Sequence, residues 1–320
     1  MRLLTILCPV FNEETAVPLF LVRMSPVMTK LSERYSVHLL FLDNASTDGT
    51  AKRLREIKAA SPAIYIITMS RNVGYQASID CGLRHAVGDL FVVIDVDCED
   101  PPEMILDFIA KHEEGYDIVY GERVHRPEPG LLVAARKFFY RLLHSVADDD
   151  IILDMAEFSL FTKEVRDAFL HENTSFPFIR SAIGRVGYRR WGIPFTRQSR
   201  IAGKSHYGLL RMAVFAIAGI LSASTLLLRL PIFVLPFWLG TLGVLGALYI
   251  VTNSPWYVLL AGLIYAFYVG ATGAFIALYV ARAYRNGLQR PNAFIDQRKS
   301  WLQPADVYGR SKALPSTDTR

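Results

Sequence analysis

The feature that most constrains this chain is a long stretch near its C-terminal end with almost no charge. Residues 208–281 contain only two charged side chains, Arg211 and Arg229, whereas residues 1–207 mix charged and apolar segments as a soluble domain does. The whole chain has 320 residues and is 52% hydrophobic, which is high for a purely soluble protein. The sequence therefore predicts a soluble head followed by a membrane tail.

Two segments of the tail are long enough to cross a bilayer. Residues 232–252 and 256–281 each reach the roughly 20 residues that span about 30 Å of hydrocarbon, and an Asn-Ser-Pro turn separates them. We therefore assign residues 231–282 to two transmembrane helices that form a hairpin. The preceding segment, 208–230, is apolar but bracketed by arginines, so we predict an amphipathic interfacial helix there rather than a third span.

Basic side chains follow the second span closely and favour a cytoplasmic location for that end. They are Arg282, Arg285, Arg290, Arg298 and Lys299. The N-terminus opens directly into a strand-like run without the pattern of a signal peptide. Because an even number of spans keeps both ends on one side, we expect a multi-pass protein of the inner (plasma) membrane. Residues 1–207 would then form a cytoplasmic catalytic domain, and residues 283–320 a cytoplasmic basic tail that is partly disordered.

Small residues recur at close-packing intervals along the first span, at Gly240, Gly243, Gly246 and Ala247. Such spacing is typical of tightly packed membrane helices. Two interpretations stay open: self-association into a homo-oligomer, or packing against the second span.

Charge and cysteine usage exclude some classes of site. A formal charge of +5 suits an anionic partner, but no compact basic stripe is interleaved with aromatic residues, so we do not expect nucleic-acid binding. The cysteines, Cys8, Cys81 and Cys98, lack metal-ligand spacing and are interpreted as buried thiols.

Within the head, short apolar runs alternate with helical patterns. The runs lie at 3–8, 37–42, 63–69 and 90–94, and the helical patterns between them at 13–33, 48–60 and 75–87. This alternation predicts βαβ units and a mostly parallel, Rossmann-like α/β sheet that is buried on both faces. Ligands bind at the carboxyl ends of the strands in such sheets.

Polar groups follow each of the first three strands. The first ends in Pro9-Val10-Phe11-Asn12-Glu13, where Asn12 can simply cap the next helix. After the second strand, Asp43 could accept a hydrogen bond from a base or ribose. After the third, Arg71 suits a phosphate or a partner aspartate.

The fourth strand gives the sharpest signal, because it ends in Asp95-Val96-Asp97. Side chains two residues apart point the same way in extended chain, and paired carboxylates suit Mg²⁺ or Mn²⁺ bound to a diphosphate. Such a metal would neutralise a departing nucleotide. The alternative is that both aspartates only cap the helix that begins near Pro102.

Together these segments resemble family-two glycosyltransferases of GT-A fold, in the branch that acts on polyprenyl phosphates. That branch includes dolichol-phosphate mannose synthases and bactoprenol glycosyltransferases. The resemblance covers nearly the whole chain and rests on the Pro-x-Phe-Asn-Glu start, the Asp-x-x-Ser-x-Asp-Gly-Thr loop, Arg-Asn-x-Gly, Asp-x-Asp and Asp-Pro-Pro-Glu. It implies nucleotide-sugar contacts from Pro9, Asn12, Glu13, Asp43, Arg71 and Asp95, and metal ligation by Asp95 and Asp97.

Later segments extend the resemblance toward the acceptor. Residues 200–207 look like the family's Arg-x-x-Gly-x-Ser-Lys-Tyr segment, and two further arginines lie where acceptor-phosphate arginines are expected. The implied acceptor-phosphate and diphosphate residues are Arg123, Arg136, Arg200, Ser205 and His206. Arg136 could equally belong to a membrane-facing basic patch.

Three departures concern the catalytic centre and its surroundings. Asn44 stands where the family usually has Asp, and His206 where it has Lys; Glu157 and Ser159 replace the Asp and Arg of a Gly-Asp-Phe-Arg-Leu segment. We assign Asp97, Asp100 and Glu157 to catalysis, with Glu157 as the candidate base. An acceptor phosphate with a second pKa of about 6 is already mostly ionised at neutral pH and hardly needs a base. Glu157 could instead orient the acceptor or a metal.

The predicted function is an inverting, metal-dependent transfer of one sugar from a nucleotide-sugar to a polyprenyl phosphate at the cytoplasmic membrane face. Two alternatives stay open. A processive polysaccharide synthase would share the head but usually has more spans and a Gln-x-x-Arg-Trp motif, of which only the Arg-Trp end, Arg190-Trp191, is present. A catalytically weak membrane scaffold would tolerate the departures. The sequence does not identify the sugar.

Overall fold

The computed structural model describes residues 1–123, 155–171, 174, 177–202 and 225–304. The head contains seven strands and the helices between them. In chain order they are β1 (Arg2–Val10), α1 (Ala16–Leu31), β2 (Tyr35–Asp43), α2 (Thr50–Ala60), β3 (Ile64–Thr68), α3 (Tyr75–His85), β4 (Leu90–Val93), α4 (Met104–Glu113), β5 (Ile118–Arg123), β6 (Met155–Thr162), α6 (Lys163–His171), α7 (Ile179–Val186) and β7 (Arg190–Phe195). Beyond them lie α9 (Leu226–Thr252), α10 (Pro255–Gly287) and the short helix η1 (Gln297–Lys299).

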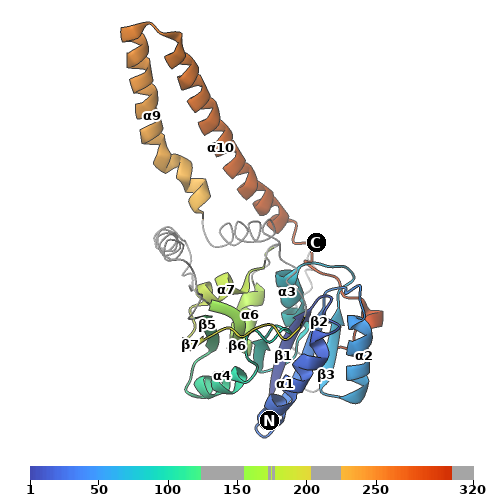
Figure 1. Cartoon of the computed structure of the whole chain (residues 1–320). Helices are drawn as coiled ribbons and strands as arrows, with labels where there is room; N and C mark the ends of the chain where they lie inside the picture. The colour runs from blue at the N-terminus through green and yellow to red at the C-terminus, as the bar shows by residue number, and fades with distance from the viewer. Residues whose placement is uncertain (124–154, 172–173, 175–176, 203–224, 305–320) are drawn as a thin grey trace, which may run out of the picture. The chain divides into compact units, whose positions relative to one another are not determined.

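The seven described strands form one mixed sheet in the order β3-β2-β1-β4-β6-β5-β7 (Figure 1). Strands β1 to β4 run parallel to one another, as the βαβ pattern predicts, and β6 enters antiparallel beside β4. Strand β5 pairs antiparallel with β6 and parallel with β7. The predicted α/β, GT-A-like fold with a mostly parallel sheet is therefore confirmed.

The sheet is buried on both faces, which explains why its strands read as continuous apolar runs. In β1, Leu4, Ile6 and Cys8 point into one core cluster while Leu7 points into the other, as the two-residue period of a strand requires. Residues of α1, α2 and α4 complete the first cluster, and residues of α3, α6 and α7 complete the second. The head is thus a three-layer sandwich whose sheet ends are free to carry a site.

All three cysteines are buried and unoxidised, as predicted. Burial raises the pKa of Cys8 well above its ordinary value and that of Cys81 and Cys98 to about 11, so none is a reactive thiolate near neutral pH. The thiols serve packing.

A segment beyond α10 returns to the head and lines the edge of the sheet; we call residues 291–303 the C-terminal strap. Ile66 and Trp301 exchange two backbone hydrogen bonds of 3.0 and 2.8 Å, and the Ser70 amide donates to the Phe294 carbonyl at 2.8 Å. The strap therefore covers the otherwise open edge of β3, which a sheet must protect. The sequence placed these residues in a basic tail and did not predict this contact.

The strap ends in a buried glutamine that joins three parts of the head. The Gln303 side chain accepts from the Val87 amide at 2.9 Å and donates to the Thr5 hydroxyl at 3.0 Å, and it lies 2.7 Å from the His38 ring. Gln303 is only 7% exposed, and its partners satisfy both ends of its amide. This cluster fixes where the strap ends.

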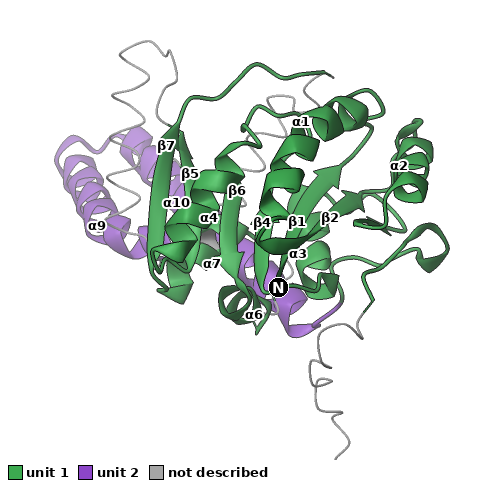
Figure 2. Cartoon of the chain, turned by 90° about the horizontal axis from the view of Figure 1, so that it is seen from below, with its two compact units in different colours: residues 1–129, 152–208, 291–320 green, residues 130–151, 209–290 purple. Residues whose placement is uncertain are grey.

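The two apolar helices belong to a compact unit separate from the head, and Figure 2 colours the two units differently. Helix α9 has 27 residues and α10 has 33, and both are long and apolar enough to cross a membrane. Pro255 begins α10 directly after the turn, where a missing amide costs no hydrogen bond. Trp238 stacks on Tyr268 with ring centroids 4.5 Å apart, and the Tyr268 hydroxyl donates to the Pro231 carbonyl at 2.9 Å.

These helices bury almost none of their apolar surface: 6% of the most apolar window of α9 and none of that of α10. A core helix of a soluble protein would be covered. A Cβ placed on Gly240, Gly243 or Gly246 would have no atom within 4 Å, so these glycines do not pack against α10. These three glycines therefore give no support to the second interpretation, packing against the second span, and self-association stays a prediction.

Most of the proposed interfacial helix at 208–230 lies outside the described residues. Residues 226–230, which were assigned to that interfacial helix, instead form the start of α9. Of the predicted tail, 305–320 also lies outside the described part.

Candidate active site

Hydrogen bonds hold the loops after β1 and β2 together. The Asn12 side chain accepts from the Thr47 amide at 2.8 Å, and the Asn12 amide donates to the Ser46 hydroxyl at 3.0 Å. The Asp43 carboxylate accepts from the Ser46 amide at 3.0 Å. Asn12 and Ala45 both have positive φ, 57° and 59°, a conformation that asparagine tolerates better than most residues. The polar turn after β1 is thereby fixed against the turn after β2.

Asn44 extends this arrangement to the loop after β3. Its amide nitrogen donates to Asn72 at 3.1 Å, and its oxygen accepts from the Val73 amide at 2.9 Å. An aspartate in its place would offer no donor to Asn72. Asn44 is therefore a structural link between two loops, which accounts for one departure from the family pattern.

The remaining predicted nucleotide residues are placed as follows. Pro9 is buried in β1 beside Leu42 of β2, one residue before Val10 faces Asp43. Glu13 is 9% exposed, and burial raises its pKa despite the opposing charge of Arg200. Arg71 is exposed beyond β3 and has no hydrogen bond or ion pair within the described ranges.

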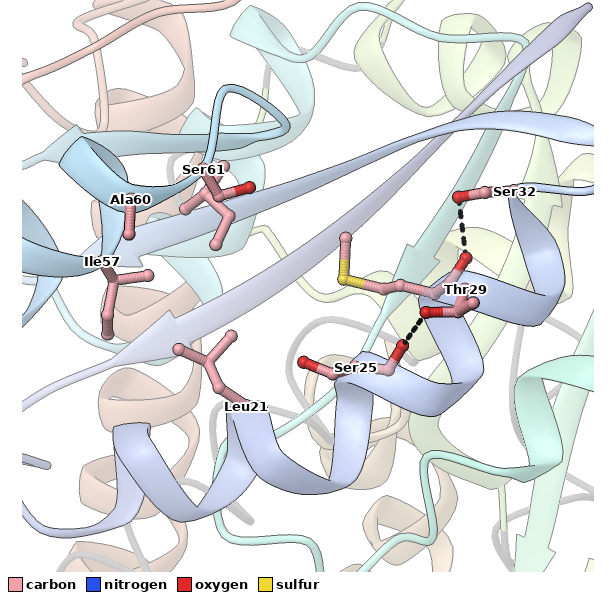
Figure 3. Close-up of a pocket in the computed structure, with 9 residues that line it drawn as sticks. Leu21, Ser25, Thr29, Ser32, Ile57, Ala60 and Ser61 are labelled. Carbon is pink, nitrogen blue, oxygen red and sulfur yellow. Dashed lines mark hydrogen bonds between the residues drawn. The ribbon is translucent and has the colours of Figure 1, made fainter.

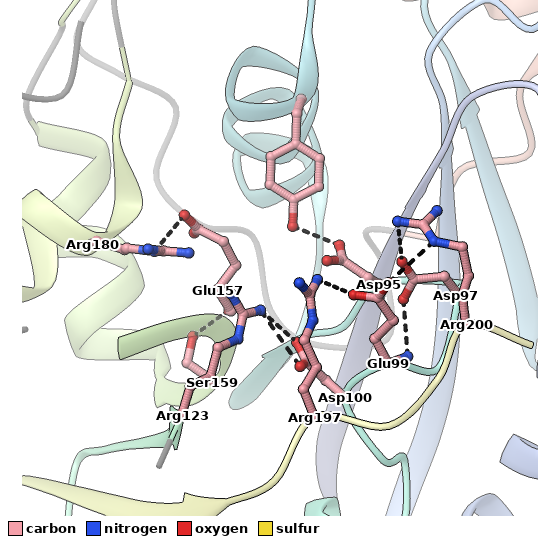
Figure 4. Close-up of polar contacts among 11 residues, drawn as sticks. Asp95, Asp97, Glu99, Asp100, Arg123, Glu157, Ser159, Arg180, Arg197 and Arg200 are labelled. Carbon is pink, nitrogen blue, oxygen red and sulfur yellow. Dashed lines mark hydrogen bonds and ion pairs between the residues drawn. The ribbon is translucent and has the colours of Figure 1, made fainter. Parts of the chain in front are cut away.

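An acidic centre follows β4, where Asp95, Asp97, Glu99 and Asp100 lie within six residues (Figure 4). The Tyr75 hydroxyl, at the start of α3, donates to Asp95 Oδ1 at 2.6 Å. Burial, followed by the charge of Asp97, raises the pKa of Asp95 to about 7. Asp95 is thus a carboxylate whose negative charge is under-compensated in this structure.

Arginines from distant segments compensate the other carboxylates of the acidic centre. Arg200 lies 3.0 Å from Asp97 and 3.2 Å from Glu99, and Arg197 also pairs with Glu99. Arg123, at the end of β5, pairs with Asp100 at 3.2 Å; Asp100 is 2% exposed, and burial raises its pKa against the effect of Arg123. Arg123 and Arg200, predicted to meet phosphates, therefore reach the same centre as the aspartates.

Glu157 on β6 completes the centre from the neighbouring strand. Its Oε1 lies 2.8 Å from Arg180 Nε and accepts from the Gln76 amide at 3.0 Å. Ser159 does not reach this carboxylate, since its hydroxyl donates to the backbone carbonyl of Glu157 at 3.0 Å. A guanidinium from α7 thus stands beside Glu157, whereas the family pattern places an arginine at 159.

The carboxylates fit a divalent metal that a diphosphate completes. Within the described part of the chain no three His, Cys, Asp or Glu side chains gather closely enough to hold a metal by themselves. Asp95 and Asp97 nevertheless offer a pair of hard oxygen ligands, and Mg²⁺ is usually bound by one or two carboxylates together with substrate phosphates. The chemistry of the donor set therefore matches a metal that arrives with a nucleotide.

A cavity elsewhere in the head has a different character. It has a volume of about 510 Å³ and lies between α1 and α2 (Figure 3). Its lining contains no charged side chain and consists of Leu21, Ser25, Met28, Thr29, Ser32, Ile57, Ala60, Ser61 and Ile64. Ile64 begins β3, so this cavity lies near the amino ends of the strands, at the opposite end of the sheet from the acidic centre.

Several predicted residues lie outside the described part, namely Arg136, Ser205 and His206. Conversely, five residues of the centre were not predicted as site residues: Tyr75, Gln76, Glu99, Arg180 and Arg197. Glu99 sits inside the acidic run and could have been included on that ground. Arg180 and Arg197 carry no local motif, so only the fold brings them in.

The chain matches the family model described as "Glycosyl transferase family 2" over residues 5–186, more than half of its length. It belongs to glycosyltransferase family 2. The matched region runs from β1 to the end of α7, so it contains Asp95, Asp97 and Glu157. The acidic centre is accordingly the candidate active site of this glycosyltransferase.

Named relatives extend the match beyond the head. An uncharacterised glycosyltransferase of Bacillus subtilis, YkcC, is 36% identical over 69% of this chain and 68% of its own length. A prophage bactoprenol glucosyl transferase homolog of Escherichia coli is 29% identical over 71% of this chain and 73% of its own length. The bactoprenol glucosyl transferase of Shigella phage SfX is 26% identical over 92% of this chain and 99% of its own.

Two solved structures are also similar to this glycosyltransferase. One is a mannosyltransferase of Pyrobaculum calidifontis in complex with GDP-Man and Mn²⁺, at 18% identity and a TM-score of 0.42 over 88% of this chain and 86% of that one. The other is glucosyl-3-phosphoglycerate synthase of Mycobacterium tuberculosis in complex with Mn²⁺, UDP and glucosyl-3-phosphoglycerate. Its sequence identity is 17% and its TM-score 0.47, over 69% of this chain and 78% of that one.

Proposed function

We propose that this glycosyltransferase moves a single sugar from a nucleotide-diphosphate sugar to a polyprenyl phosphate at the cytoplasmic face of the inner (plasma) membrane. The donor binds at the carboxyl ends of β1 to β4, and the two apolar helices anchor the protein in the bilayer that holds the acceptor. Glucose is the first sugar to test, because several relatives are named for glucosyl transfer.

The observation that carries this proposal is the joint presence of the acidic centre and of two uncovered apolar helices in one chain. Exposed apolar helices of 27 and 33 residues need a hydrocarbon environment, because exposing their apolar surfaces to water is unfavourable. A relative named as a bactoprenol glucosyl transferase aligns over 92% of the chain, a length that includes both helices. A lipid acceptor fits such an anchored enzyme.

The nucleophile we propose is the phosphate of the lipid, which requires little activation. A phosphate monoester with a second pKa of about 6 is mostly a dianion at neutral pH. The protein's contribution is therefore to bring two anionic substrates together and to neutralise charge as the nucleotide leaves. Attack in line with the departing diphosphate inverts the anomeric configuration.

Each group in the centre has a role under this proposal. Asp95 and Asp97 would hold Mg²⁺ or Mn²⁺, and the metal would supply positive charge for the leaving group. Arg200 and Arg123, already beside Asp97 and Asp100, are within reach to exchange those partners for phosphate oxygens. The loops around Asn12 and Asp43 hold the base and ribose.

The proposal is tested with the full chain in detergent or nanodiscs, undecaprenyl phosphate, and Mg²⁺ or Mn²⁺. A panel of labelled donors (UDP-glucose, GDP-mannose, UDP-N-acetylglucosamine and a UDP-aminopentose) is supplied one at a time, and label in the organic phase is measured. We expect one donor to give metal-dependent lipid-linked product. Absence of product with every donor would contradict the proposal.

The form of the product separates the two alternatives. A processive synthase would release or retain long polymer, whereas this enzyme would stop after one sugar. A membrane scaffold would give no lipid product, and its partners' activity would survive loss of Asp97.

A further inference from the structure

One oxygen of Glu157 is buried without a hydrogen-bond partner. Glu157 is 6% exposed, and its Oε2 is inaccessible and receives no hydrogen bond from the described residues. A carboxylate oxygen in that state is costly unless something donates to it. This unpaired acceptor therefore points to a hydrogen-bond donor that a ligand supplies.

The other oxygen of Glu157 is held from two sides. Arg180 of α7 forms an ion pair with Oε1 at 2.8 Å, although its Nε makes no hydrogen bond, and the Gln76 amide donates to the same oxygen at 3.0 Å. Gln76 is itself oriented, because its carbonyl oxygen accepts from the Ile179 amide at 3.3 Å. The carboxylate is thus fixed through one oxygen, and its second oxygen keeps a defined direction.

Glu157 lies across the sheet from the proposed metal-binding pair. Strands β4 and β6 are antiparallel, and the last pair in their register is Val93 opposite Ser159, so Asp95 follows the end of β4 on the side where Glu157 precedes Ser159 in β6. Two consecutive residues of α3 reach the two carboxylates, since the Tyr75 hydroxyl donates to Asp95 and the Gln76 amide donates to Glu157. A group attached to the diphosphate at Asp95 therefore comes next to Glu157.

The chemistry of the free oxygen narrows what it can bind. Phosphate oxygens are acceptors and anions, so a phosphate beside Oε2 would add repulsion and supply no donor. Arg180 already provides the countercharge, so the missing element is a hydrogen-bond donor rather than a second cation. The hydroxyl of a sugar is a neutral donor of the right kind.

We propose that Glu157 Oε2 accepts a hydrogen bond from a hydroxyl of the donor sugar, and that Arg180 and Gln76 are positioning residues for this contact. Glu157 would then help to select the sugar rather than act as a base on the acceptor. This inference rests on the proposed function, since it presumes that a nucleotide-sugar occupies the centre.

The test compares nucleotide with nucleotide-sugar in the full chain. Titration calorimetry with Mn²⁺ is run with UDP, UDP-glucose, GDP, GDP-mannose and UDP-N-acetylglucosamine; the variants are E157Q, R180A and R180K, with E33Q and R55A on exposed surface as controls. For the sugar that binds best, E157Q should weaken binding about tenfold while leaving the matching nucleotide within about twofold. R180A should also weaken binding of the nucleotide-sugar relative to the nucleotide, by a smaller factor than E157Q. R180K should restore part of this loss.

Monodeoxy analogues of that sugar then identify the hydroxyl. One analogue should bind wild type about tenfold more weakly than the parent donor, and E157Q should bind the two alike. Equal losses for nucleotide and nucleotide-sugar in E157Q, or no loss in either, would overturn the inference while leaving the proposed function in place. Failure of wild type to bind any nucleotide-sugar would overturn both.

Discussion

Two regions of the same sheet edge are organised in opposite ways. The loops after β1, β2 and β3 are joined by hydrogen bonds, such as those of Asn12, Ser46 and Asn44, and by no ion pair among the described residues. The acidic centre after β4 is balanced by arginines that come from segments far away in the chain, such as Arg123 and Arg200. The first region is complete by itself, whereas the second is held by charges that a ligand can replace.

This difference teaches what each region does when substrate binds. A loop whose polar groups are already satisfied keeps its shape and can receive a base and ribose without rearrangement. Carboxylates paired with arginines must give up those partners when a divalent cation arrives, which then leaves the arginines for phosphates. We therefore expect substitutions in the two regions to act on different steps.

The largest effect is expected from Asp97→Ala. Asp97 is 6% exposed and central to the acidic centre, so its loss removes a proposed metal ligand and leaves Arg200 with Glu99 alone. Turnover to lipid-linked product should fall by at least about 10²-fold. Asp107→Ala, on α4, is the matched control. Undiminished turnover in Asp97→Ala would place the metal site elsewhere.

Arg200→Ala should separate metal binding from turnover. In the wild type, Mn²⁺ must break the ion pair between Arg200 and Asp97, which costs about 1 kcal/mol. The variant lacks this cost, so its affinity for Mn²⁺ alone should rise about fivefold. Turnover should nevertheless fall about tenfold or more, because the diphosphate loses a cation. Free Mn²⁺ is measured by electron paramagnetic resonance, with Arg55→Ala as control. Weaker Mn²⁺ binding in Arg200→Ala would show that the pair is not displaced.

Gln303→Ala should affect stability and spare both regions of the site. The substitution leaves the Val87 amide and the Thr5 hydroxyl without their partner in a buried position, at a cost of about 2 kcal/mol. The thermal midpoint of the full chain in detergent should fall, while affinity for UDP stays the same. Gln297→Ala, exposed on η1, should leave both unchanged; a loss of UDP affinity in Gln303→Ala would instead couple the strap to the site.

The smallest effect is expected at Asn12, where two variants distinguish bonding from backbone strain. Asn12→Gly removes the acceptor for the Thr47 amide but suits a φ of 57°, so UDP affinity should fall about threefold with little loss of stability. Asn12→Ala should lose the same affinity and about 1 kcal/mol more in stability, because alanine resists that φ. Equal stability of the two variants in thermal unfolding would argue against strain at this turn.

The sequence predicted those parts of the fold and site that local patterns encode. Buried strands read as apolar runs, and Asp95 and Asp97 stand at the end of one such run, so the sheet and the position of the pair were predictable. The Asp43 and Asn12 turns were predictable for the same reason. Their roles toward a nucleotide and a metal stay predictions.

Contacts between distant segments were not predictable. Arg180 reaches Glu157 only because α7 packs on the face of the sheet beside β6, and no motif at Arg180 announces this. The C-terminal strap was interpreted as tail because its basic residues resemble a membrane flank, yet Gln303 and Trp301 dock on the sheet. Neither contact has a local sign in the sequence.

The measurement that tests the central claim most directly is the structure of the lipid product by mass spectrometry and NMR. The full chain is incubated with undecaprenyl phosphate, Mn²⁺ and the donor that gives label in the lipid phase. We expect one sugar joined directly to the lipid phosphate with the anomeric configuration opposite to that of the donor. A polymer, a retained configuration or a sugar on any other acceptor would contradict it.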